Sequence, residues 1–100
     1  MLYAGLMTSP MSVRDIIVEK LARRFAPQRL EVVDDSRRHA GHAGARPGGE
    51  THFNVYIVSS AFDGKSRIER HRMINAALAN ELAGGVHALA IHASAPGETT

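Results

Sequence analysis

Apolar residues recur at every fourth position in the segment that follows Ser12, and this spacing predicts a helix. The apolar stripe consists of Val13, Ile17, Leu21 and Phe25, with Ile16 beside it. Ser12 and Asp15 form a capping box at the start of the helix, and Pro27 ends it. We expect the stripe to be buried and the charged face of the helix to lie in solvent.

Two segments alternate between apolar and polar positions, and each is typical of a half-buried strand. In the first, residues 29–36, Leu30 and Val32 alternate with Glu31 and Val33. In the second, residues 51–59, one side carries Phe53, Val55 and Ile57 and the other carries Asn54, Tyr56 and Val58. A hairpin is the natural pairing of these two strands.

A second helix and a third strand follow. Ser66 and Glu69 form another capping box, and Gly84-Gly85 ends this helix. Its predicted apolar face contains Ile68, His71, Ile74, Leu78 and Leu82. Residues 86–94 read as a strand with His87 at its start. The order helix–strand–strand–helix–strand predicts an α+β domain, in which one three-stranded mixed sheet has both helices packed on one face.

The length of 100 residues indicates one domain. We expect residues 1–11 to be a flexible N-terminal extension, 12–96 to be the domain, and 97–100 to be a flexible tail. Residues 36–50 contain mainly Gly, Ala, Arg and His without periodicity, which predicts a long flexible loop between the first two strands. Long loops in compact domains are often functional.

Composition excludes several classes of protein. Hydrophobic residues are 44% and charged residues 22%, which is typical of a globular chain, and the net charge of +2 alone does not indicate nucleic-acid binding. The chain has no cysteine, so a disulfide framework, a zinc ribbon and a cysteine-only iron–sulfur site are excluded. The first ten residues lack the pattern of a signal peptide, and we expect a cytoplasmic protein.

Catalysis is not predicted. The acidic pair Asp34 and Asp35 lies at the end of a strand, where adjacent side chains point to opposite faces and do not form a catalytic pair. No nucleophile elbow, dinucleotide fingerprint or phosphate loop occurs in the sequence. We therefore expect a protein that is not an enzyme.

Histidine is the residue type that points to chemistry, because imidazole is a good ligand for iron, zinc or copper. His39 and His42 lie in the glycine-rich loop, and His87 begins the third strand. A site shared with a partner that brings thiolates is easier to build from these residues than a self-contained one. His71 lies on the apolar stripe of the second helix, and we interpret it as a structural histidine.

Basic residues gather around the start of the second helix. They are Lys65, Arg67, Arg70 and Arg72. Such a group can contact the phosphates of a nucleic acid or an acidic face of a partner protein.

Three stretches of the chain resemble the BolA family: LEVVDDSRRHAG, GGETHFNVYIVSSAFDGKSRIERHRMIN and LAGGVHALAIHASAP. The resemblance covers residues 13–96. It implies a fold like the second type of KH domain, usually with a short extra helical turn.

The resemblance also implies a partner, a monothiol glutaredoxin with which family members form heterodimers and share a 2Fe–2S cluster. The glutaredoxin and glutathione supply cysteine ligands, and the BolA-like chain supplies the histidine that matches His87. A second ligand comes from the loop between the first two strands, where His39 matches best and His42 is the alternative. The implied function is cluster delivery or sensing in iron–sulfur and iron homeostasis.

The alternative function is that of a DNA-binding transcriptional regulator of morphology and stress response, which the KH-like fold favours. The Gly-x-x-Gly clamp of KH domains is not evident in this sequence. Aromatic residues are 5% of the chain, so stacking platforms for single strands are expected to be scarce. Under this alternative, the basic residues around the second helix would contact phosphates.

Overall fold

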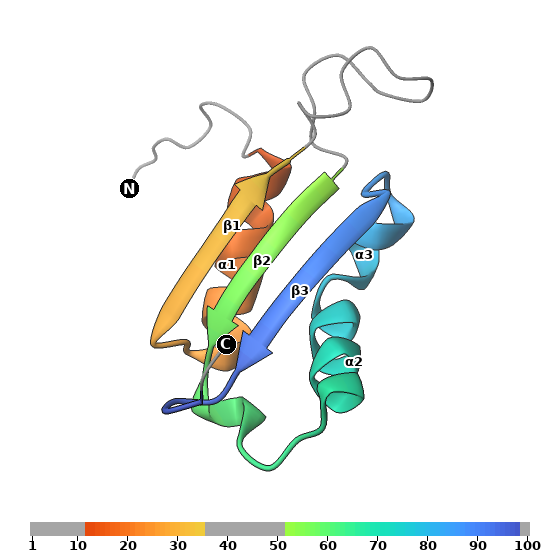
Figure 1. Ribbon diagram of the computed structural model, residues 1–100. Coiled ribbons are helices and arrows are strands. Elements are labelled where there is room, and N and C mark those ends of the chain that lie inside the picture. The colour runs from red at the N-terminus through yellow and green to blue at the C-terminus, as the bar shows by residue number, and fades with distance from the viewer. Residues whose placement is uncertain (1–11, 36–51, 99–100) are drawn as a thin grey trace.

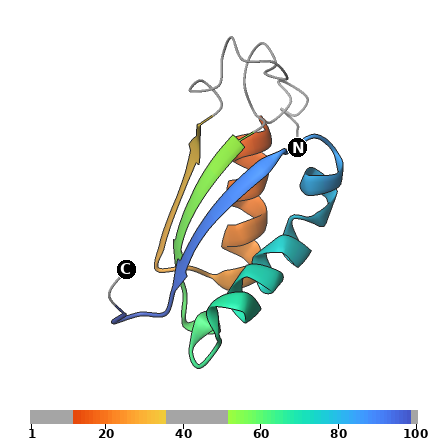
Figure 2. The same ribbon diagram turned by 45° about the vertical axis from the view of Figure 1, so that its right-hand side comes forward.

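The computed structural model describes residues 12–35 and 52–98, and it has one sheet with all helices packed on one side (Figure 1). Figure 2 shows these two layers from the side. The elements are α1 (Val13–Phe25), β1 (Arg29–Asp34), β2 (His52–Val58), the short 3-10 turn η2 (Ser60–Phe62), α2 (Arg67–Ala77), α3 (Ala79–Ala83) and β3 (Ala88–Ser94). The predicted α+β class with a three-stranded mixed sheet is confirmed.

The sheet has the strand order β1-β2-β3. β1 and β2 are antiparallel, with Val32 opposite Val55. β2 and β3 are parallel, with Val55 beside Ile91, and the chain crosses between them through α2 and α3. A parallel pair needs such a crossover, and a crossover helix also covers one face of the sheet.

The core lies between the sheet and the helices. Phe53, Val55 and Ile57 of β2 are at most 2% exposed, which confirms the predicted alternation. From α1, the core receives the predicted stripe residues Ile17, Leu21 and Phe25. The other face of the sheet carries the alternate side chains and is not covered by any helix of the described chain (Figure 2).

Both predicted N-caps form, and the reciprocal bond of a capping box is present at α2. The Ser12 hydroxyl accepts a hydrogen bond from the Asp15 N–H at 3.1 Å. At α2, the Ser66 hydroxyl accepts from the Glu69 N–H at 3.1 Å, and the Glu69 carboxylate accepts from the Ser66 N–H at 2.7 Å. The second of these bonds lowers the pKa of Glu69 below its ordinary value, because it favours the charged carboxylate.

The prediction for the second helix is wrong in two respects, its length and one residue of its buried face. The helix is interrupted at Leu78, whose ψ of 22° separates α2 from α3 while its side chain stays buried. Ile68 is 63% exposed rather than on the buried face. At about 100° per residue, Ile68 lies roughly 120° around the helix from the buried Ile74, so it points away from the sheet.

Ser59 is a buried polar residue that ties three elements together. Its hydroxyl donates to the carbonyl of Phe25 at 2.6 Å and accepts from the N–H of Ala61 at 3.1 Å. It therefore fixes the end of α1 and the start of η2 against the end of β2. The rings of Phe25 and Phe62 pack beside it, with their centroids 5.1 Å apart.

Candidate functional site

His87 lies in the connection between α3 and β3, one residue before the strand that the sequence predicted it would begin. Its side chain is exposed. The preceding residue, Val86, is only 8% exposed, and its N–H donates to the carbonyl of Glu81 at 3.2 Å. The backbone before His87 is therefore anchored, while its imidazole faces solvent.

A second histidine, His52, lies next to His87. His52 is the first residue of β2 and is in register with Ala88, the first residue of β3. The two imidazole rings have centroids 6.2 Å apart and planes at 17°. The sequence pattern predicted His52 only as part of a strand. Its position at the start of β2, parallel to the start of β3, is the signal that would place it near His87.

The two loop histidines, His39 and His42, lie outside the described residues. Both ends of their segment are nevertheless located, because the Asp35 N–H donates to the His52 carbonyl at 2.8 Å. The connection 36–51 thus leaves and rejoins the sheet at the end where His87 lies. This is the end at which a ligand from that connection would have to meet His87.

Within residues 12–35 and 52–98, no group of three or more His, Cys, Asp or Glu side chains is arranged to hold a metal ion. His52 and His87 offer two nitrogen donors at most. A metal bound at this end of the sheet would take its remaining ligands from elsewhere.

The basic residues divide into two kinds. Lys65, Arg67 and Arg72 are exposed. Arg70 is different, because its side chain is only 12% exposed and binds Glu98 through two contacts of 2.6 and 2.8 Å. Arg70 also donates to the carbonyls of Lys65 and Ala93, at 2.9 and 3.2 Å.

Arg70 is therefore engaged within the chain, and its role toward a partner stays a prediction. The hydrogen bonds from Arg70 lower the pKa of Glu98 to about 2, and the Ala95 N–H adds to the effect by donating to the same carboxylate. The pKa of Arg70 is raised in turn by the hydrogen bond to Glu98. The chain is therefore anchored as far as Glu98, within the segment predicted as a flexible tail.

A basic hollow of about 480 Å³ lies beside this ion pair. Its lining includes Lys65, Arg67, Arg70, His71, His92 and Glu98. His71 is partly buried and lines this hollow, outside the set of buried core residues. Arg72, the fourth predicted basic residue, is not among the lining residues.

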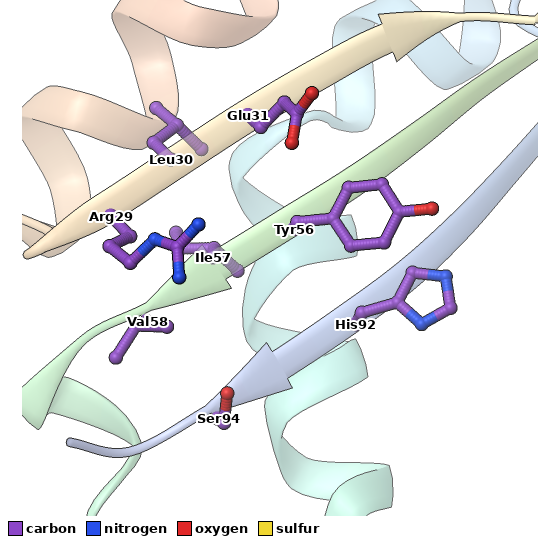
Figure 3. A pocket seen from close by; sticks show the side chains of 8 residues that line it. All are labelled: Arg29, Leu30, Glu31, Tyr56, Ile57, Val58, His92 and Ser94. Carbon is purple, nitrogen blue, oxygen red and sulfur yellow. The ribbon is translucent and has the colours of Figure 1, made fainter. Parts of the chain in front are cut away.

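A second hollow, of about 360 Å³, lies on the open face of the sheet (Figure 3). Its lining includes Arg29, Glu31, Tyr56, Val58, His92 and Ser94. Tyr56 and His92 are neighbours in the β2–β3 register, and their rings have centroids 4.6 Å apart and planes at 6°. His92 lines both hollows, so they adjoin at this residue.

No helix in the described parts of the chain has the length and apolar character required to cross a membrane.

The chain is similar to several known proteins. A protein of Sinorhizobium sp, described as an uncharacterized protein in the cobS 5' region, is 52% identical over 91 residues, which are 90% of this chain and 98% of that one. The DNA-binding transcriptional regulator BolA of Escherichia coli (strain K12) is 50% identical over 82 residues, which are 82% of this chain and 74% of that one.

The solved BolA domain of SufE1 from Arabidopsis thaliana superposes with a TM-score of 0.79 at 48% identity, and the alignment covers 91% of this chain and all of that domain. The chain spans only 23% of the whole SufE-like protein 1 of that plant. Residues 21–98 match the family BolA, described as BolA-like protein. The chain therefore belongs to the BolA family.

Proposed function

We propose that this BolA-family chain forms a heterodimer with a monothiol glutaredoxin and shares a 2Fe–2S cluster with it, His87 being one of the ligands. The observation that carries the proposal is the position of His87. It is an exposed imidazole on an anchored backbone, at the end of the sheet where the connection 36–51 begins and ends. A histidine in this setting can donate to an iron atom held by another molecule.

The second ligand from this chain would come from the same connection, where His39 and His42 are the two candidates. Cysteine ligands would come from the glutaredoxin and from glutathione, because this chain has no cysteine. When bound, the cluster supplies iron and sulfide that can be transferred to a recipient, and it can accept an electron. Neutral imidazole in place of a thiolate adds no negative charge and raises the reduction potential. Ligation of this kind fits cluster delivery or sensing.

We further propose that the protein acts in the cytoplasm without catalysis of its own, and that its fold is KH-like of the second type. The order α1-β1-β2-α2-β3, with both long helices on one face of the sheet, supports this fold assignment.

Visible absorption and circular dichroism test the proposal. The chain is mixed anaerobically with a monothiol glutaredoxin that carries its glutathione-ligated cluster. We expect the wild type to change the glutaredoxin spectrum and His87→Ala to lose that change. Calorimetric titration with glutaredoxin that lacks the cluster should give similar affinities for both chains, because His87 contributes through iron.

His92→Ala is the matched control, because it removes an exposed histidine within β3, away from the end of the sheet where His87 lies. It should keep the spectrum of the wild-type complex. Identical spectra for wild type and His87→Ala, both unchanged from glutaredoxin alone, would exclude His87 as a ligand.

A second candidate function is DNA binding, which the name of the Escherichia coli relative supports. The exposed Lys65, Arg67 and Arg72 offer positive charge for phosphates. If this function is primary, Arg67→Ala should weaken DNA binding in a gel-shift assay, and His87→Ala should not. Arg70 is unsuited to this test, because its loss would also release Glu98.

A further inference from the structure

We propose that the open face of the sheet binds single-stranded nucleic acid, with bases stacked on Tyr56 and His92 and phosphates in the basic hollow beside them. The inference is independent of the glutaredoxin role. It deepens the second candidate function, because it names the form of nucleic acid and the surface that binds it.

The ring pair provides a stacking platform. Figure 3 shows the rings of Tyr56 and His92 next to each other over β2 and β3. The two rings are stacked, with centroids 4.6 Å apart, so the outward face of the pair is the one left for a base. Their planes differ by only 6°, and Tyr56 is 43% exposed. All helices of the described chain lie on the opposite face of the sheet. Two parallel rings fixed on adjacent strands can stack against unpaired bases, and every base offers a π-face for such stacking.

Charge near the platform determines where the phosphates would lie. The hollow that adjoins the platform at His92 is lined by the cations Lys65, Arg67 and Arg70 and by the single carboxylate of Glu98. Because Arg70 already neutralises Glu98, the exposed Lys65 and Arg67 are the charges left to attract an anion. A nucleic-acid strand whose bases lie on the platform can therefore place its phosphates on the β3 side of the sheet.

The β1 side of the platform is less suitable for the sugar-phosphate backbone of the nucleic acid. Glu31 lies opposite Tyr56 in the β1–β2 register, and it lines the open-face hollow together with Arg29. The carboxylate repels phosphates but can accept hydrogen bonds from base amino groups. A single orientation follows, with bases over β2 and β3 and phosphates toward the start of α2.

The form of nucleic acid follows from the kind of contact. In a duplex the base faces are stacked on one another, whereas an unpaired strand exposes them to protein rings. The platform is also separate from the histidines proposed for the cluster. His52 and Tyr56 are four positions apart on β2, or roughly 13 Å along the strand. Loss of one activity therefore need not remove the other.

Fluorescence anisotropy with a labelled single-stranded oligonucleotide of about 12 nucleotides tests this inference on the full chain. We expect Tyr56→Ala to weaken binding about tenfold, or about 1.4 kcal/mol, and Tyr56→Phe to bind like the wild type because it keeps the ring. Glu31→Gln should strengthen binding. The double variant Lys65→Ala/Arg67→Ala should reduce the slope of log affinity against log salt by about 1.4, for two phosphate contacts.

Arg24→Ala is the matched control for charge, because it removes an exposed cation from α1, which covers the other face of the sheet. Its salt slope should equal that of the wild type. His87→Ala should also bind the oligonucleotide normally, so failure of the cluster experiment and failure of this one can be told apart. Circular dichroism melts confirm that each variant is folded.

Two results would overturn the inference. In one, an unlabelled duplex competes as strongly as the unlabelled single strand, and Tyr56→Ala binds the labelled oligonucleotide as tightly as the wild type. The other is a Tyr56→Ala chain that binds the oligonucleotide normally but loses affinity for glutaredoxin, which would assign the platform to the protein partner.

Discussion

The two faces of β2 differ in what their side chains do, although they alternate along one seven-residue strand. Phe53, Val55 and Ile57 point into the core and are 2%, 0% and 1% exposed. His52 and Tyr56 alternate with these residues and belong to the other face of the strand. The His52 ring lies near that of His87, and the Tyr56 ring is stacked with that of His92. One strand therefore contributes stability from one face and candidate binding groups from the other.

The two sets of residues therefore meet separate physical demands. Burial of a large apolar side chain stabilises the fold by about 1.5–3 kcal/mol, and a cavity adds to the loss when such a side chain is truncated. Exposed cross-strand pairs contribute only about 0.2–1 kcal/mol each. The aromatic and imidazole rings on the open face therefore contribute little to the stability of the fold.

The largest expected effect is on the buried face. Phe53→Ala should lower the free energy of unfolding by about 3–5 kcal/mol, because it leaves a cavity between the sheet and the helices. Tyr56→Ala, three positions along the same strand, should lower it by at most about 1 kcal/mol. Urea denaturation followed by circular dichroism measures both. Equal losses for the two variants would contradict the division between the faces.

A smaller loss of stability is expected just after β2, where a polar side chain lies in the interior. Ser59 is polar but completely buried. Ser59→Ala should lower the free energy of unfolding by about 1–3 kcal/mol, because the carbonyl of Phe25 would lose a buried donor. Ser60→Ala is the matched control, since Ser60 is the exposed next residue. A loss no greater than that of the control would mean that water replaces the Ser59 hydroxyl.

Local sequence patterns predicted most of the fold. The alternation in β2, the stripe of α1, the capping box of α2 and the Ser12 cap of α1 depend on residues within a few positions of one another, and the structure confirms them. The interruption at Leu78 has no helix-breaking residue to mark it. Leu78 itself is 1% exposed, as the spacing of the apolar face predicted, so the burial of this residue was predictable although the interruption was not.

The candidate site was predicted less completely, because its contacts join distant parts of the chain. His87 was found from its position before an apolar strand, but its neighbour His52 depends on the parallel register of β2 and β3. The Tyr56–His92 pair depends on the same register. Arg70 looked like its basic neighbours in sequence, and only its pairing with Glu98, 28 positions later, distinguishes it from them.

The smallest expected effect is confined to acid pH and concerns Glu98, beyond the end of β3. Its pKa is about 2 in the folded chain against an ordinary value of 4.5, because Arg70 donates hydrogen bonds to the carboxylate. A folded pKa below the unfolded one stabilises the fold above pH 4.5, and this contribution disappears as the pH falls toward 2. Wild type should therefore have a higher urea midpoint than Glu98→Gln at pH 7, and the two midpoints should converge near pH 2.

Glu19→Gln is the control for that series, because it removes a carboxylate that pairs with Arg23 on the exposed surface of α1. Its effect at pH 7 should be smaller than that of Glu98→Gln, since exposed pairs four residues apart on a helix contribute little. A difference between wild type and Glu98→Gln that persists unchanged to pH 2 would show that packing of the side chain, rather than its charge, holds the C-terminal segment against β3.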